Sequence, residues 1–169
     1  MSVYLRWGLP VMVVAVLSCI AWGFINTLNH KQKTAERIQK LPAFIAHKLD
    51  STIIDVTGLA NHPIVFIYFD PECDHCQREA HELRRKSASL NKAQIIMLST
   101  APLSTLKTFA QTYQLTKLSN VQVAHIDRKI AHETFGFTSV PDVLIYRANG
   151  SLAKHFRGET SIEAIARHL

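Results

Sequence analysis

The feature that most constrains the fold is an apolar stretch that leads into two closely spaced cysteines. Ile64–Phe69 is rich in β-branched and aromatic residues, which predicts a buried strand. Residues 70–72 (Asp-Pro-Glu) predict a turn, and apolar residues then recur at helical spacing from Cys76 onward. Cys73 and Cys76 are therefore expected at the start of a helix that follows a core strand. There, unpaired backbone N–H groups and the positive end of the helix dipole favour a thiolate.

The rest of the chain alternates predicted strands with predicted helices. Further strands are expected over Gln94–Ser99, Val121–His125, Val143–Tyr146 and Ser151–Phe156, and further helices over Leu103–Tyr113, Arg128–Phe135 and Ser161–Leu169. A small hairpin of Ala43–Lys48 and Thr52–Val56 is expected before them, and Asn149–Gly150 predicts a type I′ turn. The pattern indicates an α/β domain over residues 42–169, with a central mixed β-sheet flanked by helices.

The N-terminal segment has no charged residue from Trp7 to Leu28. As a helix this run would extend about 30 Å, which matches the hydrocarbon core of a bilayer. It predicts one N-terminal transmembrane helix within residues 1–28. The polar residues 29–41 predict a stalk that ends at Pro42.

Two alternatives to an uncleaved anchor stay open. A cleaved secretory signal peptide also has an apolar region, although a shorter one. Residues 16–19 (Val-Leu-Ser-Cys) loosely resemble a lipobox, which would make Cys19 a lipidation site. Against both alternatives, the apolar run continues past Cys19 through residues 20–25.

Basic residues gather near the N-terminal segment. The chain has 19 basic and 13 acidic residues. Residues 1–41 hold five of the basic residues and one of the acidic residues, which leaves 14 basic and 12 acidic residues in the domain. This near balance excludes a nucleic-acid footprint on the domain and favours a basic stretch beside anionic lipid. The charges that flank the apolar run favour a cytosolic domain by the positive-inside rule. The chemistry of the domain favours the opposite, extracytoplasmic side.

The cysteine pair is compatible with two kinds of chemistry. Cysteines at positions i and i+3 of a helix can form a disulfide or bind one metal ion. The position after a core strand favours redox chemistry, in which the Cys73 thiolate attacks a partner disulfide and Cys76 resolves the mixed disulfide. An alternative is a copper-delivery module with Cys73, Cys76 and either His75 or His81 as ligands. A peroxidase is less favoured, because Asp70 stands where such sites have threonine.

Neighbouring residues could tune or assist the pair. Protonated His75 would stabilise the Cys73 thiolate, whereas the flanking acids Glu72 and Asp74 would oppose this. Glu79 lies one helical turn after Cys76 and could exchange the Cys76 proton through a water molecule. Alternatively, Glu79 is an exposed helix carboxylate paired with a nearby arginine.

Val140 and Pro141 stand at the entry to a predicted strand. Proline at the start of a strand often only interrupts the pairing or marks an edge strand. A cis Val140–Pro141 bond would instead expose the Val140 backbone to a docked peptide, although cis bonds are only about 5–6% of X–Pro bonds.

Several motifs together resemble the thioredoxin-like superfamily, and within it the membrane-anchored TlpA/ResA-like redoxins. They are Tyr-Phe-Asp-Pro-Glu-Cys-Asp-His-Cys-Gln-Arg-Glu (residues 68–79), Phe-Gly-Phe-Thr-Ser-Val-Pro-Asp-Val-Leu-Ile-Tyr (135–146), Asn-Gly (149–150) and Phe-Arg-Gly-Glu (156–159). The resemblance implies a thioredoxin-like fold over residues 42–169. It also implies Cys73 as nucleophile, Cys76 as resolving thiol in a redox disulfide, Glu79 as active-site acid and Pro141 as a cis-proline that faces the cysteines.

The resemblance also implies the cellular setting. Such proteins act on disulfide-bearing protein substrates, receive electrons from a membrane thiol-transfer protein, and usually face the periplasm or the cell exterior. We therefore expect a membrane-anchored, monomeric reductase in the cell envelope, with no cofactor and no metal.

The chain departs from the family at several positions. Ile67 replaces the buried acid of thioredoxin, which makes Glu79 the expected proton relay. Glu72 replaces the usual tryptophan, His81 a helix proline, and Asp142 a common threonine. Asp-His replaces Gly-Pro between the cysteines, and a histidine there resembles the more oxidising disulfide isomerases, so the motif alone leaves the direction of electron flow open.

Overall fold

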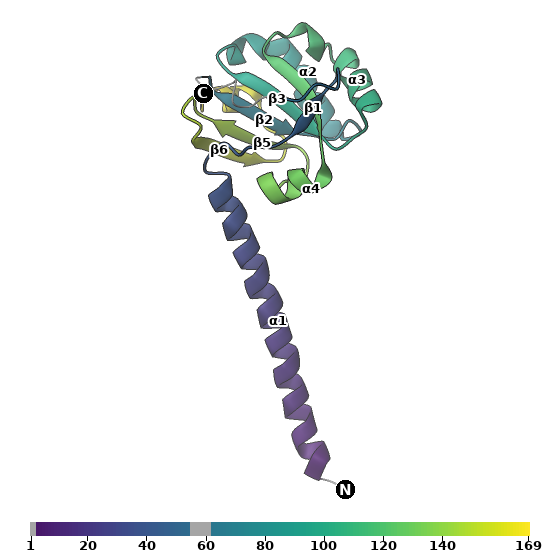
Figure 1. Ribbon diagram of the computed structural model, residues 1–169, viewed down its shortest axis with the longest axis vertical. Coiled ribbons are helices and arrows are strands. Elements are labelled where there is room, and N and C mark those ends of the chain that lie inside the picture. The colour runs from purple at the N-terminus through teal and green to yellow at the C-terminus, as the bar shows by residue number, and fades with distance from the viewer. Residues whose placement is uncertain (1–2, 55–61) are drawn as a thin grey trace. The chain divides into compact units, whose positions relative to one another are not determined.

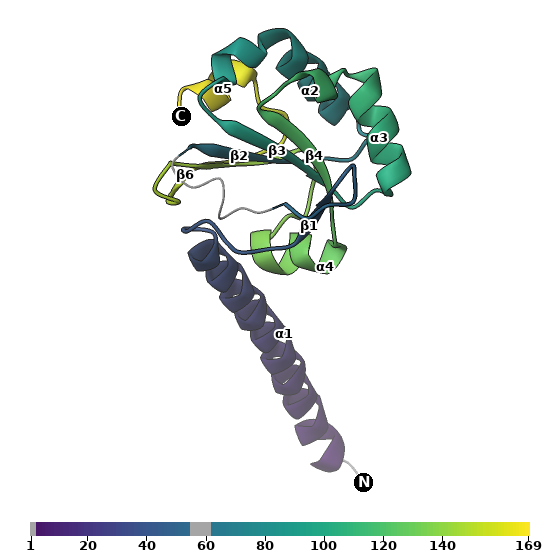
Figure 2. The same cartoon turned by 45° about the horizontal axis from the view of Figure 1, so that its top comes forward.

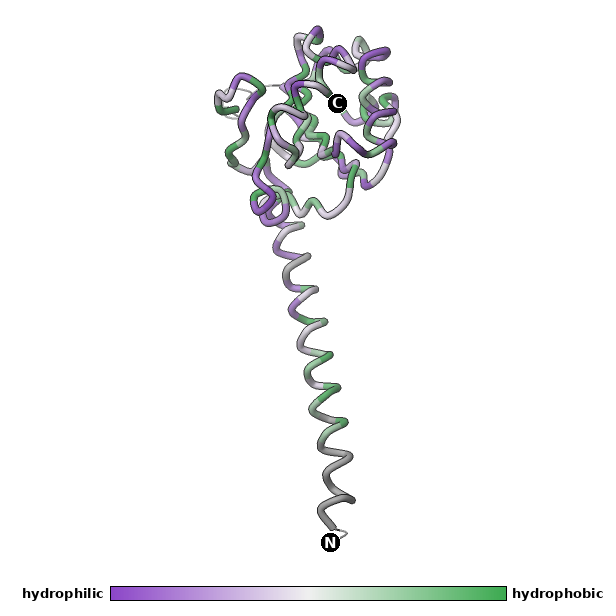
Figure 3. The backbone as a smooth tube through the Cα atoms, turned by 90° about the vertical axis from the view of Figure 1, so that its right-hand side faces the viewer, coloured by the Kyte–Doolittle hydropathy of each residue, from purple (hydrophilic) through white to green (hydrophobic). Residues whose placement is uncertain are grey.

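The computed structural model describes residues 3–54 and 62–169, which form parts of two compact units, Met1–Glu36 and Arg37–Leu169. Almost all of the first unit belongs to one long helix, α1 (Val3–Arg37). Several large apolar side chains of α1 are exposed, among them Met12, Leu17, Ile20 and Trp22. Figure 3 shows this apolar stretch giving way to polar residues toward the C-terminal end of the helix.

Among the described residues, no helix combines the length and the apolar character needed to cross a membrane. The predicted helix in the N-terminal segment is therefore confirmed as a helix, and its membrane-spanning role is not. The predicted stalk continues the same helix as far as Arg37, five residues before Pro42. Ile38 already belongs to the second unit, where its side chain is buried.

The second unit is built on one six-stranded mixed sheet in the order β1-β4-β3-β2-β5-β6 (Figure 1). The strands are β1 (Ala46–Lys48), β2 (Ile64–Tyr68), β3 (Gln94–Ser99), β4 (Val121–Ile126), β5 (Asp142–Tyr146) and β6 (Leu152–Arg157). The three central strands β2, β3 and β4 are parallel, whereas β1, β5 and β6 pair antiparallel to their neighbours. The predicted mixed sheet is confirmed.

Helices cover both faces of this sheet. The longer helices are α2 (Asp74–Lys86) and α3 (Leu103–Thr112), and the shorter ones are α4 (Arg128–Ile130) and α5 (Ile162–Ala166). Three single turns complete the unit: η2 (Ser87–Leu90), η3 (Leu115–Lys117) and the π-helical η4 (Ala131–Phe135). Figure 2 shows α2, α3 and α5 on one face and α4 on the other.

The core strand β2 explains how the two faces are filled. Its side chains alternate, because successive residues of a strand point to opposite faces. Val65 and Ile67 pack in the apolar cluster beneath α2, α3 and α5, which also holds Cys76. Ile64 and Phe66 pack in the cluster on the α4 side. Both faces of β2 are buried, as its uninterrupted apolar sequence predicts.

The predicted N-terminal hairpin is only partly formed. β1 pairs with β4. Of the second predicted strand, Thr52–Val56, the described residues 52–54 form only a bridge between His47 and Ile53. Residues 50–52 form a tight turn in place of a longer strand. The Asp50 carboxylate stabilises this turn because it accepts hydrogen bonds from the Thr52 N–H and hydroxyl. The last residues of that predicted strand, and most of the loop predicted after it, lie outside the described residues.

The predicted type I′ turn at Asn149–Gly150 is wrong in detail. Only Gly150 of the two has a positive φ, of 76°. The loop is one residue longer than a type I′ turn requires: the Gly150 N–H donates to the Arg147 carbonyl, and the strands are irregularly paired at Ile145/Tyr146. The Asn149 side chain stabilises this loop by accepting hydrogen bonds from Ser151.

Candidate active site

A tight turn at the end of β2 delivers Cys73 to the start of α2. Within this turn, the Asp70 carboxylate accepts the Glu72 N–H at 2.8 Å, and the Asp70 carbonyl accepts the Cys73 N–H at 3.1 Å. Cys73 has extended backbone angles and occupies the N-cap position, with no hydrogen bond from its side chain to the first turn among the described residues. The Cys73 side chain thus leaves the backbone at the N-cap position, at the positive end of the helix dipole.

The two cysteines differ sharply in exposure. Cys73 is partly exposed, whereas Cys76 is 1% exposed and lies within the core cluster. Both are free thiols in this structure. Burial raises the pKa of the Cys76 thiol well above its ordinary value, and the nearby Cys73 and Glu79 side chains add to the rise, while a hydrogen bond from the Asp70 backbone opposes it. The pair therefore consists of an accessible thiol and a protected one.

Glu79 is buried behind the cysteines. Its side chain is 3% exposed, and neither carboxylate oxygen has a hydrogen-bond partner among the described residues. Burial raises its pKa to about 8, and the negative charge of Glu159 adds to this, whereas the Thr160 backbone opposes it slightly. The alternative of an exposed carboxylate paired with arginine is therefore wrong. A carboxyl group with this pKa, close to a buried thiol, is suited to exchange a proton near neutral pH.

Val140 and Pro141 form the segment that leads into β5. The bond between them is cis, as the family resemblance implies. Val140 is partly buried and packs against the same apolar cluster as Cys73. The Pro141 carbonyl accepts the Gly158 N–H at 2.8 Å, and Gly158 has a φ of 90°, a conformation that favours glycine. This bond joins the start of β5 to the end of β6 beside the site.

His75 lies in a cluster with two partners that come from different parts of the chain. Its Nδ1 is 2.5 Å from Glu159 Oε2 and 2.6 Å from Arg78 Nη2. Arg78 also donates to both carboxylate oxygens of Glu159, at 3.1 and 2.9 Å. Hydrogen bonds from Arg78, and then from His75, lower the pKa of Glu159 to about 2. The predicted tuning residue is thus tied directly to a carboxylate.

The ligand set of the copper alternative is not confirmed. In the part of the chain that the structure describes, no three His, Cys, Asp or Glu side chains lie together in a way that could hold a metal ion. His75 is engaged by Glu159 and Arg78, and His81 is an exposed residue whose nearest acidic partner is Glu82, at 4.0 Å.

A groove of about 450 Å³ adjoins the cysteine turn. It is lined by Pro71, Glu72, Gln77, Ser104, Thr105, Thr108, Phe109, Thr112 and Tyr113. The lining is rich in hydroxyl groups from α3, with two aromatic side chains and the Glu72 carboxylate. A peptide that reached Cys73 over this groove would meet hydrogen-bonding groups and aromatic surface together.

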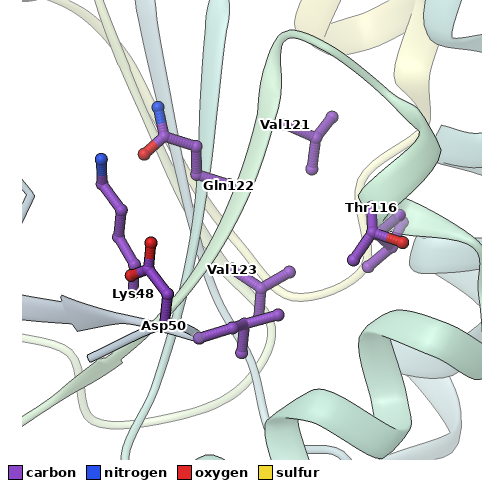
Figure 4. A pocket seen from close by; sticks show the side chains of 8 residues that line it. Lys48, Asp50, Thr116, Val121, Gln122 and Val123 are labelled. Carbon is purple, nitrogen blue, oxygen red and sulfur yellow. The ribbon is translucent and has the colours of Figure 1, made fainter. Parts of the chain in front are cut away.

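A second hollow, of about 250 Å³, lies away from the cysteines. Figure 4 shows side chains that line it, including Lys48, Asp50, Thr116 and Gln122. They come from β1 and its turn, from η3 and from β4. None of the residues that line it belongs to the cysteine turn, to α2 or to the Val140–Pro141 segment, so we do not include this hollow in the candidate active site.

Neither Glu159 nor Arg78 was predicted from the sequence as a partner of His75. The two residues are 81 positions apart, and no local pattern connects them. The available signals were Gly158, which follows the last strand, and the motif of residues 156–159, which ends in Glu159.

Comparisons with known proteins agree with this fold. A family model described as a thioredoxin-like domain matches residues 49–169. A secreted disulfide oxidoreductase of Mycobacterium tuberculosis, homologous to Escherichia coli DsbE, is 23% identical with a TM-score of 0.60, over 75% of this chain and 88% of that one. DsbF of the same organism is 20% identical with a TM-score of 0.64, over 78% and 93%. A thiol:disulfide interchange protein of Chlorobium tepidum is 15% identical with a TM-score of 0.62, over 76% and 92%. No curated protein matches the chain.

Proposed function

Because this chain belongs to the thioredoxin-like domain family, we propose that it is a thiol–disulfide oxidoreductase that reduces disulfide bonds of other proteins. The observation that carries the proposal is the arrangement around α2. An accessible Cys73 stands at the helix start, and the buried Cys76 and the buried Glu79 lie behind it. The solved proteins of similar fold include several described as disulfide oxidoreductases or thiol:disulfide interchange proteins.

The reaction has two steps. In the first, the Cys73 thiolate attacks one sulfur of the partner disulfide, so that a Cys73–partner bond forms, and the other partner sulfur leaves as a thiolate and takes up a proton. In the second, Cys76 gives its proton to ionised Glu79 and attacks Cys73. The Cys73–Cys76 disulfide forms, and the partner sulfur leaves Cys73 as a thiolate that takes up a proton, so that the partner now carries two thiols. The partner has gained the electron pair that this protein has lost.

The charges near the cysteine pair support electron transfer from this protein to its partner. A redox pair is a strong oxidant when its thiolate form is strongly stabilised. Here Glu72 and Asp74 flank Cys73, and Glu159 binds His75 and Arg78. These acids limit the positive charge available to the Cys73 thiolate, which favours a reductase. A membrane thiol-transfer protein is the electron donor that we propose for it.

Replacing Cys76 with alanine is the experiment that tests the function. The variant is expected to keep the first step and lose the second, so that mixed disulfides between Cys73 and other proteins accumulate. They are detected by non-reducing electrophoresis and mass spectrometry, and they disappear on addition of dithiothreitol. The matched control, Cys73→Ala, keeps only the buried thiol of the pair and should trap none through it. Equal trapping by the two variants, or trapping by neither together with no thiol exchange in the unmodified protein, would contradict the proposal.

We also propose that α1 anchors the protein to a membrane, with the domain on the extracytoplasmic side. The support is the uncharged sequence from Trp7 to Leu28 and the exposed apolar side chains of α1, which need an apolar environment. The M. tuberculosis oxidoreductase of similar fold is described as secreted. An oxidising compartment supplies the disulfides on which the proposed reaction depends.

The localisation proposal is tested with the full chain in cells. The protein is expected in the membrane fraction after washing with carbonate, and protease added to spheroplasts is expected to digest residues 37–169. A cytosolic loading marker must survive the same treatment. Recovery in the soluble fraction would overturn the anchor, and a protected domain would overturn the extracytoplasmic orientation.

A further inference from the structure

The cluster of His75, Arg78 and Glu159 has a geometry that a general surface ion pair does not share. Glu159 follows β6, whereas the other two residues lie in the first two turns of α2. Both oxygens of Glu159 accept hydrogen bonds from Arg78, one through Nε and one through Nη2. A two-point contact of this kind fixes the guanidinium in orientation as well as in distance.

The His75 ring completes the cluster through one nitrogen atom. Nδ1 lies within hydrogen-bond distance of both Glu159 Oε2 and Arg78 Nη2. When Nδ1 carries a proton it can donate to Glu159, and when it carries none it can accept from Arg78. In either state its partner at this nitrogen lies inside the cluster. His75 lies between the two cysteines in the sequence, but its Nδ1 is bound within the cluster, so it is not a free cation beside them.

The cluster is close enough to Cys73 to influence it. Hydrogen bonding to Glu159 is the main reason that the pKa of Arg78 is raised, but the charges of Asp74 and of the Cys73 thiolate contribute as well. His75 lies two residues after Cys73 and Arg78 five residues after it, so both side chains leave the first two turns of the helix that Cys73 caps. Glu159 also reaches the other side of the site, since its charge acts on the buried Glu79. The remaining acids at the helix start are Glu72 and Asp74.

We propose that Glu159 is a positioning residue that keeps the Cys73–Cys76 pair reducing, because it holds and neutralises Arg78 and His75 and so withholds their positive charge from the Cys73 thiolate. The inference deepens the proposed function and rests on it: it names the residue that sets the direction in which the electrons flow. Without Glu159, the guanidinium and any protonated imidazole would stabilise the thiolate and make the pair a stronger oxidant.

The test uses two substitutions that remove opposite charges from the same ion pair. Glu159→Gln keeps the size and part of the hydrogen bonding of the side chain, and Arg78→Gln removes the cation. Each full-length variant is equilibrated with reduced and oxidised glutathione, and the fraction of reduced Cys73–Cys76 is measured by thiol alkylation and mass spectrometry. The pH titration of thiolate ultraviolet absorbance is recorded in parallel. Glu82→Gln is the matched control, since Glu82 forms ion pairs with Arg85 and Lys86 on the same helix.

Opposite shifts are the expected result. Glu159→Gln should move the equilibrium constant about tenfold toward the reduced pair, which corresponds to ~30 mV, and Arg78→Gln should move it in the other direction. Thiolate absorbance should appear at lower pH in the first variant and at higher pH in the second, while Glu82→Gln leaves both readouts unchanged. A merely structural clamp would make the two variants shift alike, and that outcome would overturn the proposal, as would a shift of less than twofold in Glu159→Gln.

Failure of this inference is distinguishable from failure of the proposed function. Equilibration with glutathione and the thiolate titration need no protein substrate, so they report on Glu159 whether or not partner proteins are reduced. Absence of mixed disulfides in Cys76→Ala would overturn the function and leave these two measurements readable.

Discussion

Replacing Glu79 with glutamine is expected to make the folded protein more stable at about pH 8 and slower in thiol exchange. The folded-state pKa of Glu79, about 8, lies above its ordinary value of 4.5. Between these values the unfolded chain binds fewer protons than the folded one, so the free energy of unfolding falls as the pH rises through this range. With ~1.4 kcal/mol for each pH unit, the loss reaches on the order of 5 kcal/mol above the folded-state pKa.

The measurement is urea unfolding of the reduced protein at several pH values from about 5 to about 8. The wild type should lose stability along this series, and Glu79→Gln, which cannot ionise, should lose much less. Glu82→Gln, at a partly exposed position on the same helix, should follow the wild type. Parallel curves for wild type and Glu79→Gln would show that Glu79 does not carry this burial cost.

The same substitution has the opposite effect on rate. Ionised Glu79 accepts the Cys76 proton in the proposed second step, and general-base catalysis typically contributes 10²–10⁴-fold. Release of the partner from the mixed disulfide should therefore slow by roughly 10²-fold in Glu79→Gln, as measured by quenched-flow, while formation of the mixed disulfide changes little. Equal slowing of both steps would assign Glu79 a structural role only.

Cys73 is expected to react with iodoacetamide at least about 100-fold faster than Cys76 at neutral pH. The thiolate is the reactive form, and burial both raises the pKa of Cys76 and shields its sulfur from the reagent. Cys73 stands partly exposed at the N-cap of α2, where the helix dipole favours its anion.

Peptide mass spectrometry of the reduced protein after short labelling gives the two rates separately. The variant Cys73→Ser shows whether Cys76 stays protected when it is the only thiol of the pair, and denaturation in urea should abolish the difference between the two cysteines. Comparable labelling of Cys73 and Cys76 in the folded protein would contradict the assignment of nucleophile and resolving thiol.

The local pattern of the sequence was enough to predict the centre of the fold. The strand Ile64–Tyr68 and the helix that begins beside Cys73 form where an apolar run gives way to helical spacing, since each signal is contained in a dozen residues. The α/β alternation then predicted the mixed sheet and the helices on both faces. The errors fall at short elements, such as the turn at Asn149–Gly150, where one added residue in the loop changes the turn type.

The site was less accessible to sequence reasoning. Whether Glu79 is buried or exposed depends on the segment near Thr160 that packs over it, and a helix sequence does not contain that information. The ion pair of Arg78 with Glu159 likewise forms only because β5 and β6 return the chain to the start of α2. The cysteines and the Val140–Pro141 bond were identifiable because their types and order carry a resemblance to a family.

The bond between the Pro141 carbonyl and the Gly158 N–H has a consequence for the newly made protein. The N-terminal part of a chain leaves the ribosome first, and His75 precedes Glu159 by 84 residues. Glu159 therefore reaches His75 and Arg78 only after the hairpin of β5 and β6 has formed. The reducing character that we propose for the cysteine pair depends in this way on the last part of the chain to be made.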